Sequence, residues 1–273
     1  MSDVISTHVT RNRNLLIKSV ALPSEHGGWG FLLEPILLGL LVAASWAGAL
    51  LSLAALGVFL LHQPLKIAVK DRLKGRRPPR TVWAERFAFG YGLLALIPML
   101  VLLASAPADF LLPIILAIPF AAAQLYYDAR NQSRQLIPEI SGAAALAMIA
   151  PAIAVLGGWT LMAALPLWGV LAIRAVTSIL YVRARLKLEH GKAISPMPVW
   201  VAHGVALAGI IVLGVLRVLP YMTIAAFVVL MGRAWVGLSV HRQPREAKII
   251  GFQEMGYGLI TVVCVAVGYG LNL

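Results

Sequence analysis

The sequence predicts an all-α, polytopic membrane protein, and three observations support this class. Hydrophobic residues make up 60% of the 273-residue chain, and charged residues only 12%. The mean hydropathy of +0.86 lies far above the range of soluble domains. Apolar runs recur along the whole chain, and each approaches the roughly 20 residues that a helix needs to cross a bilayer.

The positions of these runs predict nine transmembrane helices. The expected spans cover residues 28–46, 49–69, 87–106, 110–127, 137–156, 160–182, 197–216, 219–238 and 250–271. Of the 23 lysines and arginines, all but Arg217 lie before the first span, at or after the ends of the second, fourth and eighth spans, or in or after the sixth. By the positive-inside rule, the N-terminus is therefore cytoplasmic and the C-terminus external. The expected external connections are short, so function is expected in the membrane or on the cytoplasmic face.

We expect residues 1–22 to form a cytoplasmic tail and residues 23–273 to form a single transmembrane domain. No removable signal peptide is predicted, because the polar, basic start is not followed by a short apolar segment with a cleavage site. A lone cysteine, Cys264, excludes an internal disulfide and is expected to be a packing residue. Topology explains the net charge of +12, so the charge does not indicate nucleic-acid binding.

The first candidate site lies at the entry to the first span, in Pro23-Ser-Glu-His-Gly-Gly-Trp-Gly30. Glu25 and His26 are candidates for acid–base chemistry, and helix N-terminal amides beside them could receive an anion. The alternative is an interfacial anchor built around Trp29. Deeper in the same span, Glu34 is an intramembrane carboxylate, which marks either a substrate site or a structural ion pair with Lys66 or Arg174.

The second candidate site runs from Phe59 to Pro79, at the end of the second span. His62, Lys66 and Lys70 are four residues apart, so a helix places them on one face, followed by Asp71. Pro64 is expected to break this helix and widen the space beside His62. Contacts of long basic side chains with lipid head groups account for the outer bases from Lys74 onward.

Two further groups of polar residues could line a site. The connection between the fourth and fifth spans is dense in polar residues and is either part of a site or an ordinary capped loop. The sixth span carries polar residues at three- and four-residue intervals, which form an inward-facing stripe on a membrane helix. His203 is a weaker candidate in the seventh span. The candidates from these regions are Tyr127, Asp128, Arg130, Glu139, Arg174, Ser178, Tyr181, Arg185 and His203.

Several familiar catalytic signatures are missing from the sequence. It contains no Walker loop, dinucleotide-binding glycine motif, nucleophile elbow or paired-cysteine metal site. A catalytic triad is therefore not indicated, and no residue is assigned as a metal ligand.

The Pro23–Gly30 motif, the nine expected spans and His62-Gln-Pro64 resemble the YwiC-like family of bacterial membrane proteins. A more distant resemblance is to UbiA-type intramembrane prenyltransferases. That resemblance implies a nine-helix UbiA-like bundle with polar motifs at the cytoplasmic ends of the second and sixth spans. In those enzymes, Asp-rich motifs at both places bind Mg²⁺ and a prenyl diphosphate. Here the same places carry mainly bases, with a single Asp71 and a single Glu189, which disfavours Mg²⁺.

We therefore expect a UbiA-like enzyme of the bacterial cytoplasmic (inner) membrane that acts on a lipophilic, anionic substrate of the prenyl diphosphate type. In this hypothesis Lys66, Lys70, Arg174 and Arg185 neutralise the anion, while Glu25, His26 and His62 supply acid–base chemistry. The expected partners are membrane lipid and this lipophilic small molecule, without nucleic acid. No cofactor or oligomeric state is assigned. Alternatives are a carrier for an anionic lipid or metabolite, and a haem- or quinone-binding protein that uses His26, His62 and His203.

Overall fold

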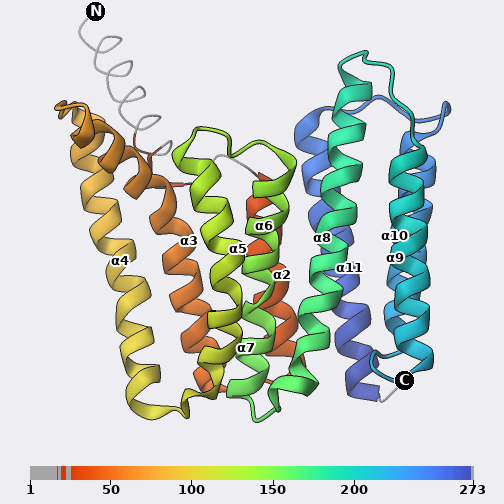
Figure 1. The fold of residues 1–273 in the computed structure, drawn as a ribbon, viewed down its shortest axis with the longest axis horizontal. Helices are drawn as coiled ribbons and strands as arrows, with labels where there is room; N and C mark the ends of the chain where they lie inside the picture. The colour runs from red at the N-terminus through yellow and green to blue at the C-terminus, as the bar shows by residue number, and fades with distance from the viewer. Residues whose placement is uncertain (1–16, 18–19, 23–25, 272–273) are drawn as a thin grey trace, which may run out of the picture. The chain divides into compact units, whose positions relative to one another are not determined.

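The computed structural model describes residues 17, 20–22 and 26–271, with the side chains of residues 26 and 27 left out. The described part of the chain is helical, as expected, and contains no strand (Figure 1). Its elements are α2 (His26–Val42), α3 (Trp46–Leu73), α4 (Pro79–Ser105), the short 3₁₀ helix η1 (Ala108–Phe110), α5 (Leu111–Ala129), α6 (Leu136–Ala147), α7 (Ile149–Leu156), α8 (Leu161–Glu189), α9 (Met197–Val215), α10 (Met222–Leu238) and α11 (Ala247–Leu271).

Seven helical segments within the described residues are long and apolar enough to cross a membrane. Two further apolar helices, Gly28–Val42 and Met222–Leu238, are shorter. The helices thus confirm a multi-pass membrane protein, whereas the number of nine crossings and the orientation of the termini stay predictions.

Several helix boundaries differ from the expected spans. The helix α4 begins at Pro79, eight residues before the expected start of the third span at 87. The helix α3 continues past Pro64 to Leu73, so the expected break is wrong: a membrane helix tolerates the one backbone hydrogen bond that proline removes. The expected fifth span is divided into α6 and α7 at Met148, close to Pro151, which cannot donate to the carbonyl of Ala147. The helix α8 extends to Glu189, seven residues beyond the expected end of the sixth span at 182.

Contacts between Cα atoms divide the chain into two compact units. Unit 1 comprises residues 1–25 and 50–106, and unit 2 comprises residues 26–49 and 107–273. This division reflects where contacts are dense and does not show whether either unit folds independently. The single transmembrane domain expected from the sequence therefore stays a prediction.

Unit 1 is built around the antiparallel pair α3 and α4. The backbones of the two helices approach closely at Gly57, where an added Cβ would lie 2.5 Å from the amide nitrogen of Ala95. About three turns further along α3, Ala68 and Ala84 are buried against Val20. Small residues at a helix crossing let membrane helices pack backbone to backbone, which gives this hairpin its close fit.

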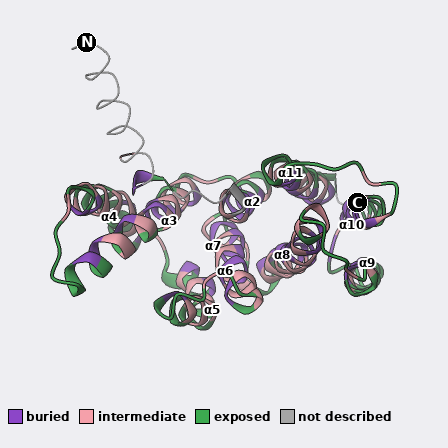
Figure 2. Ribbon diagram, turned by 90° about the horizontal axis from the view of Figure 1, so that it is seen from above, coloured by how far each residue is buried: buried purple, intermediate pink, exposed green. Residues whose placement is uncertain are grey.

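Unit 2 is organised around α8. This helix contacts α2, α6, α7, α9, α10 and α11. Seen from above, α8 lies between α6 and α7 on one side and α9 and α10 on the other, with α2 and α11 across from it (Figure 2). The core contains many alanines, among them Ala147, Ala150, Ala154 and Ala164, so the helices can approach closely. A residue on the inner faces of α8 can therefore reach partners on several other helices.

Candidate functional site

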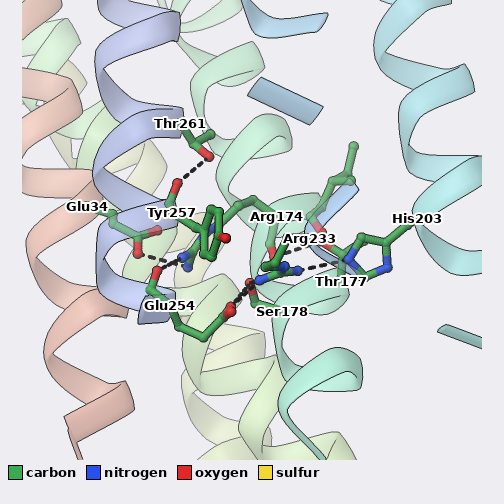
Figure 3. Close-up of polar contacts among 10 residues, drawn as sticks. Glu34, Arg174, Thr177, Ser178, His203, Arg233, Glu254, Tyr257 and Thr261 are labelled. Carbon is green, nitrogen blue, oxygen red and sulfur yellow. Dashed lines mark hydrogen bonds and ion pairs between the residues drawn. The ribbon is translucent and has the colours of Figure 1, made fainter. Parts of the chain in front are cut away.

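Unit 2 encloses a group of polar side chains, which we call the buried polar cluster (Figure 3). The five expected stripe residues of α8 all face inward: Arg174, Thr177, Ser178, Tyr181 and Arg185 are each at most 7% exposed. Other helices supply their partners. The cluster comprises Glu34 of α2, Arg174, Ser178 and Tyr181 of α8, His203 of α9, Arg233 of α10, and Glu254 and Tyr257 of α11.

Arg174 connects α8 to both α2 and α11. Its Nη1 lies 2.8 Å from Oε1 of Glu34, which confirms one of the two ion pairs expected for that carboxylate. Its Nη2 donates a hydrogen bond of 2.7 Å to the backbone carbonyl of Glu254. This arrangement needs Gly258, because an added Cβ there would lie 2.0 Å from Oε1 of Glu34 and 2.7 Å from Nη2 of Arg174.

Arg233 occupies the other half of the cluster. Its Nη1 forms an ion pair with Oε2 of Glu254, which also accepts a hydrogen bond of 2.9 Å from Oγ of Ser178. The guanidinium carbon lies 4.2 Å from the ring centroid of Tyr181 and 5.4 Å from that of Tyr257. Cation–π contacts of this kind stabilise a desolvated guanidinium. Arg233 is therefore held by one carboxylate and two aromatic rings.

His203 has both ring nitrogens occupied. Its Nδ1 lies 2.8 Å from the carbonyl of Val199, and its Nε2 lies 2.9 Å from Nη2 of Arg233. A carbonyl only accepts and a guanidinium only donates, so the contacts assign the proton to Nδ1 and leave Nε2 as an acceptor. His203 is thus neutral, and neither nitrogen is free to ligate a haem iron. This geometry argues against His203 as a haem ligand.

The buried polar cluster balances its charges. Two carboxylates, Glu34 and Glu254, face two guanidinium groups, Arg174 and Arg233, and all four residues are at least nine-tenths buried. Charges in a membrane interior are costly unless they are paired. The charge of Arg174 is therefore already paired with Glu34, and, within the described residues, only its buried Nε lacks a hydrogen-bond partner.

The last turns of α8 bind the neighbouring connections. Arg185 donates to the carbonyls of Gly237 and Gln243 and pairs with Glu189 at 2.9 Å. Arg183 pairs with Glu139 at 2.8 Å. Arg185, expected to bind substrate, therefore joins α8 to the connection after α10.

The connection between α5 and α6 brings together its aromatic and basic residues. Arg130 lies over the ring of Tyr126, 4.3 Å from the centroid, and Tyr127 packs edge-on against the same ring. Asp128 is buried at the end of α5. These contacts are typical of an ordered helix end, and the predicted substrate role of Tyr127, Asp128 and Arg130 stays a prediction.

Unit 1 contains a separate candidate site at the turn between α3 and α4, which we call the basic pocket. Its volume is about 590 Å³, and its lining residues are Lys70, Asp71, Lys74, Arg76, Arg77, Pro78 and Arg80. Five of these side chains are cationic, and one is a carboxylate. The basic pocket therefore carries the excess positive charge that the buried polar cluster lacks.

The local sequence forms this pocket by reversing the chain sharply. The amide of Gly75 donates to the carbonyl of Arg72, and that of Arg76 donates to the carbonyl of Asp71. Gly75 has a φ of +63°, the left-handed conformation that ends many helices in this pattern. Pro79 then starts α4, because its fixed φ suits the first helical position. The turn brings the bases after Gly75 back over the end of α3.

Residues at the start of α4 donate hydrogen bonds to the carboxylate of Asp71. Arg80 binds it with two hydrogen bonds, Nε to Oδ2 at 3.0 Å and Nη2 to Oδ1 at 2.7 Å. Thr81 donates a third, of 2.7 Å, to Oδ2. Although α3 and α4 are largely exposed here, the residue Asp71 is only 4% exposed. The carboxylate is thus a fixed countercharge under the basic pocket.

These contacts do not fit the Mg²⁺ that the UbiA resemblance implies. Mg²⁺ prefers several unengaged oxygen ligands. Both oxygens of Asp71 already accept hydrogen bonds, and those of the nearby Glu85 accept from Arg72 and Arg77. Among the described residues, no group of three or more His, Cys, Asp or Glu side chains could hold a metal ion.

The remaining predicted site residues are divided between the two units. His62, Lys66 and Lys70 lie along continuous helix α3, in unit 1, with His62 and Lys70 exposed and Lys66 half-buried. Glu25 falls outside the described residues. His26 begins α2 in unit 2, but its side chain is not described.

Two parts of these sites were missed by the sequence reasoning. Arg233 was attributed to topology, although it lies five residues before the end of an apolar helix and should have counted as an intramembrane charge. The bases from Lys74 to Arg80 were attributed to lipid contacts alone. Gly75 and Pro79 were the signals that the chain turns back at this point.

The helices and their buried ion pairs define a multi-pass helical membrane protein. Residues 22–154 match the model of the family described as YwiC-like protein, which is slightly less than half of the chain. This match confirms the resemblance to the YwiC-like family over these residues, which include the Pro23–Gly30 motif and the basic pocket. No curated protein and no solved structure matches the chain significantly. The resemblance to UbiA-type prenyltransferases stays a prediction.

Proposed function

We propose that the protein is an enzyme of the bacterial cytoplasmic membrane, with a UbiA-like arrangement of nine spans, that acts on a lipophilic anionic substrate of the prenyl diphosphate type. In this proposal the basic pocket, at the cytoplasmic end of α3, receives the anionic group. The apolar helices shelter the hydrocarbon tail from water.

The observation that carries this proposal is the surplus of cations in the basic pocket. Lys and Arg bind phosphate oxygens directly through charge-assisted hydrogen bonds. A pocket of about 590 Å³ has room for such a head group. The buried polar cluster supports the proposal less, because its arginines already pair with carboxylates. The proposed anion site thus shifts from Arg174 and Arg185 toward Lys70 and the bases that follow it.

Of the residues expected to supply acid–base chemistry, His62 belongs to unit 1 together with the basic pocket. His62 lies eight residues, or about two helical turns, before Lys70 on α3, on the same face of the helix. This spacing lets His62 lie on the membrane side of a head group bound near Lys70. Substitution of His62 with Gln, which removes a titratable group but keeps hydrogen bonding, should lower turnover more than binding.

The experiment incubates the purified protein in nanodiscs with labelled prenyl diphosphates of several chain lengths and a mixture of hydrophobic acceptors. We expect consumption of at least one prenyl diphosphate, measured by chromatography of the labelled products. The test variant carries Lys74→Gln and Arg76→Gln, which remove two of the pocket's cations and should lower both binding and consumption. Absence of turnover at every chain length would disprove the enzyme, whether or not the prenyl diphosphates bind.

A carrier for an anionic lipid or metabolite is the second candidate, and the buried polar cluster favours it. Ionisable groups inside a membrane helix bundle often mark substrate or ion pathways. Five helices of unit 2 contribute to this cluster. Uptake of labelled anions into proteoliposomes tests the carrier: uptake that depends on Arg174 and Arg233 would replace the enzyme proposal, and absence of uptake would exclude the carrier.

A further inference from the structure

The bases around the basic pocket differ in how far the protein itself satisfies them. Asp71 accepts two hydrogen bonds from Arg80. Glu85 pairs with Arg72 and Arg77 at 2.7 Å each. Each of the two carboxylates is therefore used by arginines of the turn and of its flanking helices.

Lys74 and Arg76 are different. Within the described part of the chain, neither side chain makes a hydrogen bond or an ion pair, although both line the basic pocket. Both are exposed and flank Gly75 in the turn between α3 and α4, where the chain reverses direction. Their cationic groups are available to an incoming anion at no cost to an internal pair.

We propose that the basic pocket binds a phosphate-bearing head group directly, through Lys74 and Arg76 with support from Lys70, without a bridging divalent cation. This inference rests on the proposed function and specifies how its anion site works. Asp71 acts as a fixed countercharge that holds Arg80 at the edge of the pocket.

The placement of the carboxylates carries the metal-free part of the inference. A bridging cation would need oxygens that face the bound phosphate and are not already shared with arginines. Asp71 gives its oxygens to Arg80 and Thr81. Freeing them for a metal would release Arg80 and break three hydrogen bonds. The bases can neutralise the phosphate without that rearrangement.

Phosphate also fits the pocket better than a single carboxylate does. A phosphate or diphosphate offers several acceptor oxygens and more than one negative charge, and planar guanidinium groups bind it bidentately. The same chemistry occurs in a prenyl diphosphate and in the head group of an anionic phospholipid. The experiment therefore includes an arm for each source.

The experiment measures binding of inorganic pyrophosphate and of geranyl diphosphate to the full chain by calorimetry, in nanodiscs of neutral phosphatidylcholine. Each titration is run with EDTA and with Mg²⁺. We expect the affinity in EDTA to be at least as high as with Mg²⁺, because Mg²⁺ complexes pyrophosphate in solution and lowers its charge. A parallel titration in nanodiscs that contain phosphatidylglycerol shows whether a lipid head group competes for the site.

Three variants test the residues. Lys74→Gln with Arg76→Gln should weaken pyrophosphate binding by about 10-fold or more, because charged hydrogen bonds are lost. Arg86→Gln is a control for the loss of positive charge near the pocket: it removes one cation from α4, against two in the test variant, and Arg86 lies over Trp83 and does not line the pocket. Asp71→Asn should leave metal-free binding intact or tighter, because the cations lose their countercharge.

The outcomes separate this inference from the proposed function. Binding that requires Mg²⁺ and is lost in Asp71→Asn overturns the inference but leaves a prenyl diphosphate enzyme standing. Metal-free binding without turnover supports the inference and removes the enzyme. Displacement by phosphatidylglycerol supports a phosphate site whose natural occupant is a lipid.

Equal binding by the Lys74/Arg76 variant and by wild type overturns the inference, as does absence of all phosphate binding. The wild-type titrations need no variant, so a poorly folded mutant does not prevent the decision.

Discussion

The buried polar cluster and the basic pocket both consist of arginines and carboxylates, but their charge balance differs. In the cluster, each of the two guanidinium groups has a carboxylate partner, Glu34 for Arg174 and Glu254 for Arg233. In the basic pocket, five cations face a single lining carboxylate. The two sites differ also in exposure: Arg174 is 2% exposed, whereas the side chain of Arg80 is 55% exposed.

This difference follows from the cost of removing charge from water. A buried cation without a partner costs several kcal/mol, so each cation buried inside unit 2 needs a carboxylate partner. At the exposed turn, water screens the excess charge, and a surplus is tolerated. The two sites therefore suit different tasks: the cluster fixes helices to one another, and the pocket can receive an external anion.

The largest effect is expected when one carboxylate of the buried polar cluster is removed. Glu254→Ala leaves Arg233 buried without its carboxylate, and we expect a loss of about 3–5 kcal/mol in the free energy of unfolding. Denaturant titration in bicelles measures it. Adding Arg233→Leu should recover part of the loss, because the orphaned charge is then gone. If Glu254→Ala unfolds like wild type, the balance of charges does not hold unit 2 together.

A second test changes packing and leaves all charges in place. Gly258→Ala puts a Cβ 2.0 Å from Oε1 of Glu34, and overpacking of this kind should cost about 1–3 kcal/mol. Gly256→Ala is the matched control on the same helix, since its Cβ would meet nothing within 4 Å. The control should be neutral or slightly stabilising, because alanine favours a helix over glycine. Equal melting temperatures for the two variants would contradict the close fit around Glu34.

Ionic strength should affect the basic pocket and the buried polar cluster differently. Raising the ionic strength from about 0.1 to 1 M shortens the Debye length from about 10 to 3 Å. We expect pyrophosphate affinity at the exposed basic pocket to fall by about 10-fold or more, because several charge–charge contacts are screened. The melting temperature, which depends on the buried pairs, should change little. A salt-insensitive affinity would show that the anion binds elsewhere.

The smallest effect is expected at an ion pair of intermediate exposure. Arg183 and Glu139 lie 2.8 Å apart, with side chains 38% and 32% exposed. Replacing Arg183 with Gln should cost less than about 1 kcal/mol, as for surface pairs in general. The same denaturant titration measures this change. A loss as large as that of Glu254→Ala would show that exposure does not set the worth of these pairs.

Much of the helical arrangement was predictable, because apolar length and periodicity act locally along the chain. The inward stripe on α8 followed from the spacing of Arg174, Ser178 and Tyr181, and Arg174 was already one of two partners expected for Glu34. The rest of the cluster was not predictable. Gly258 lies 224 positions after Glu34, and only the fold reveals that the glycine makes room for the carboxylate. At the basic pocket the bases themselves were visible, but the engagement of Asp71 by Arg80 depends on the geometry of the turn.

The order of the ion pairs along the chain has a consequence for biosynthesis. Glu34 lies in α2 and is synthesised long before its partner Arg174, so that arginine can pair as soon as α8 enters the membrane. Arg233 must wait for Glu254, which follows 21 residues later in the last helix, α11. Until then, the nascent chain carries an unneutralised arginine in the apolar helix α10. A chain that ends before α11 should therefore be removed by membrane quality control.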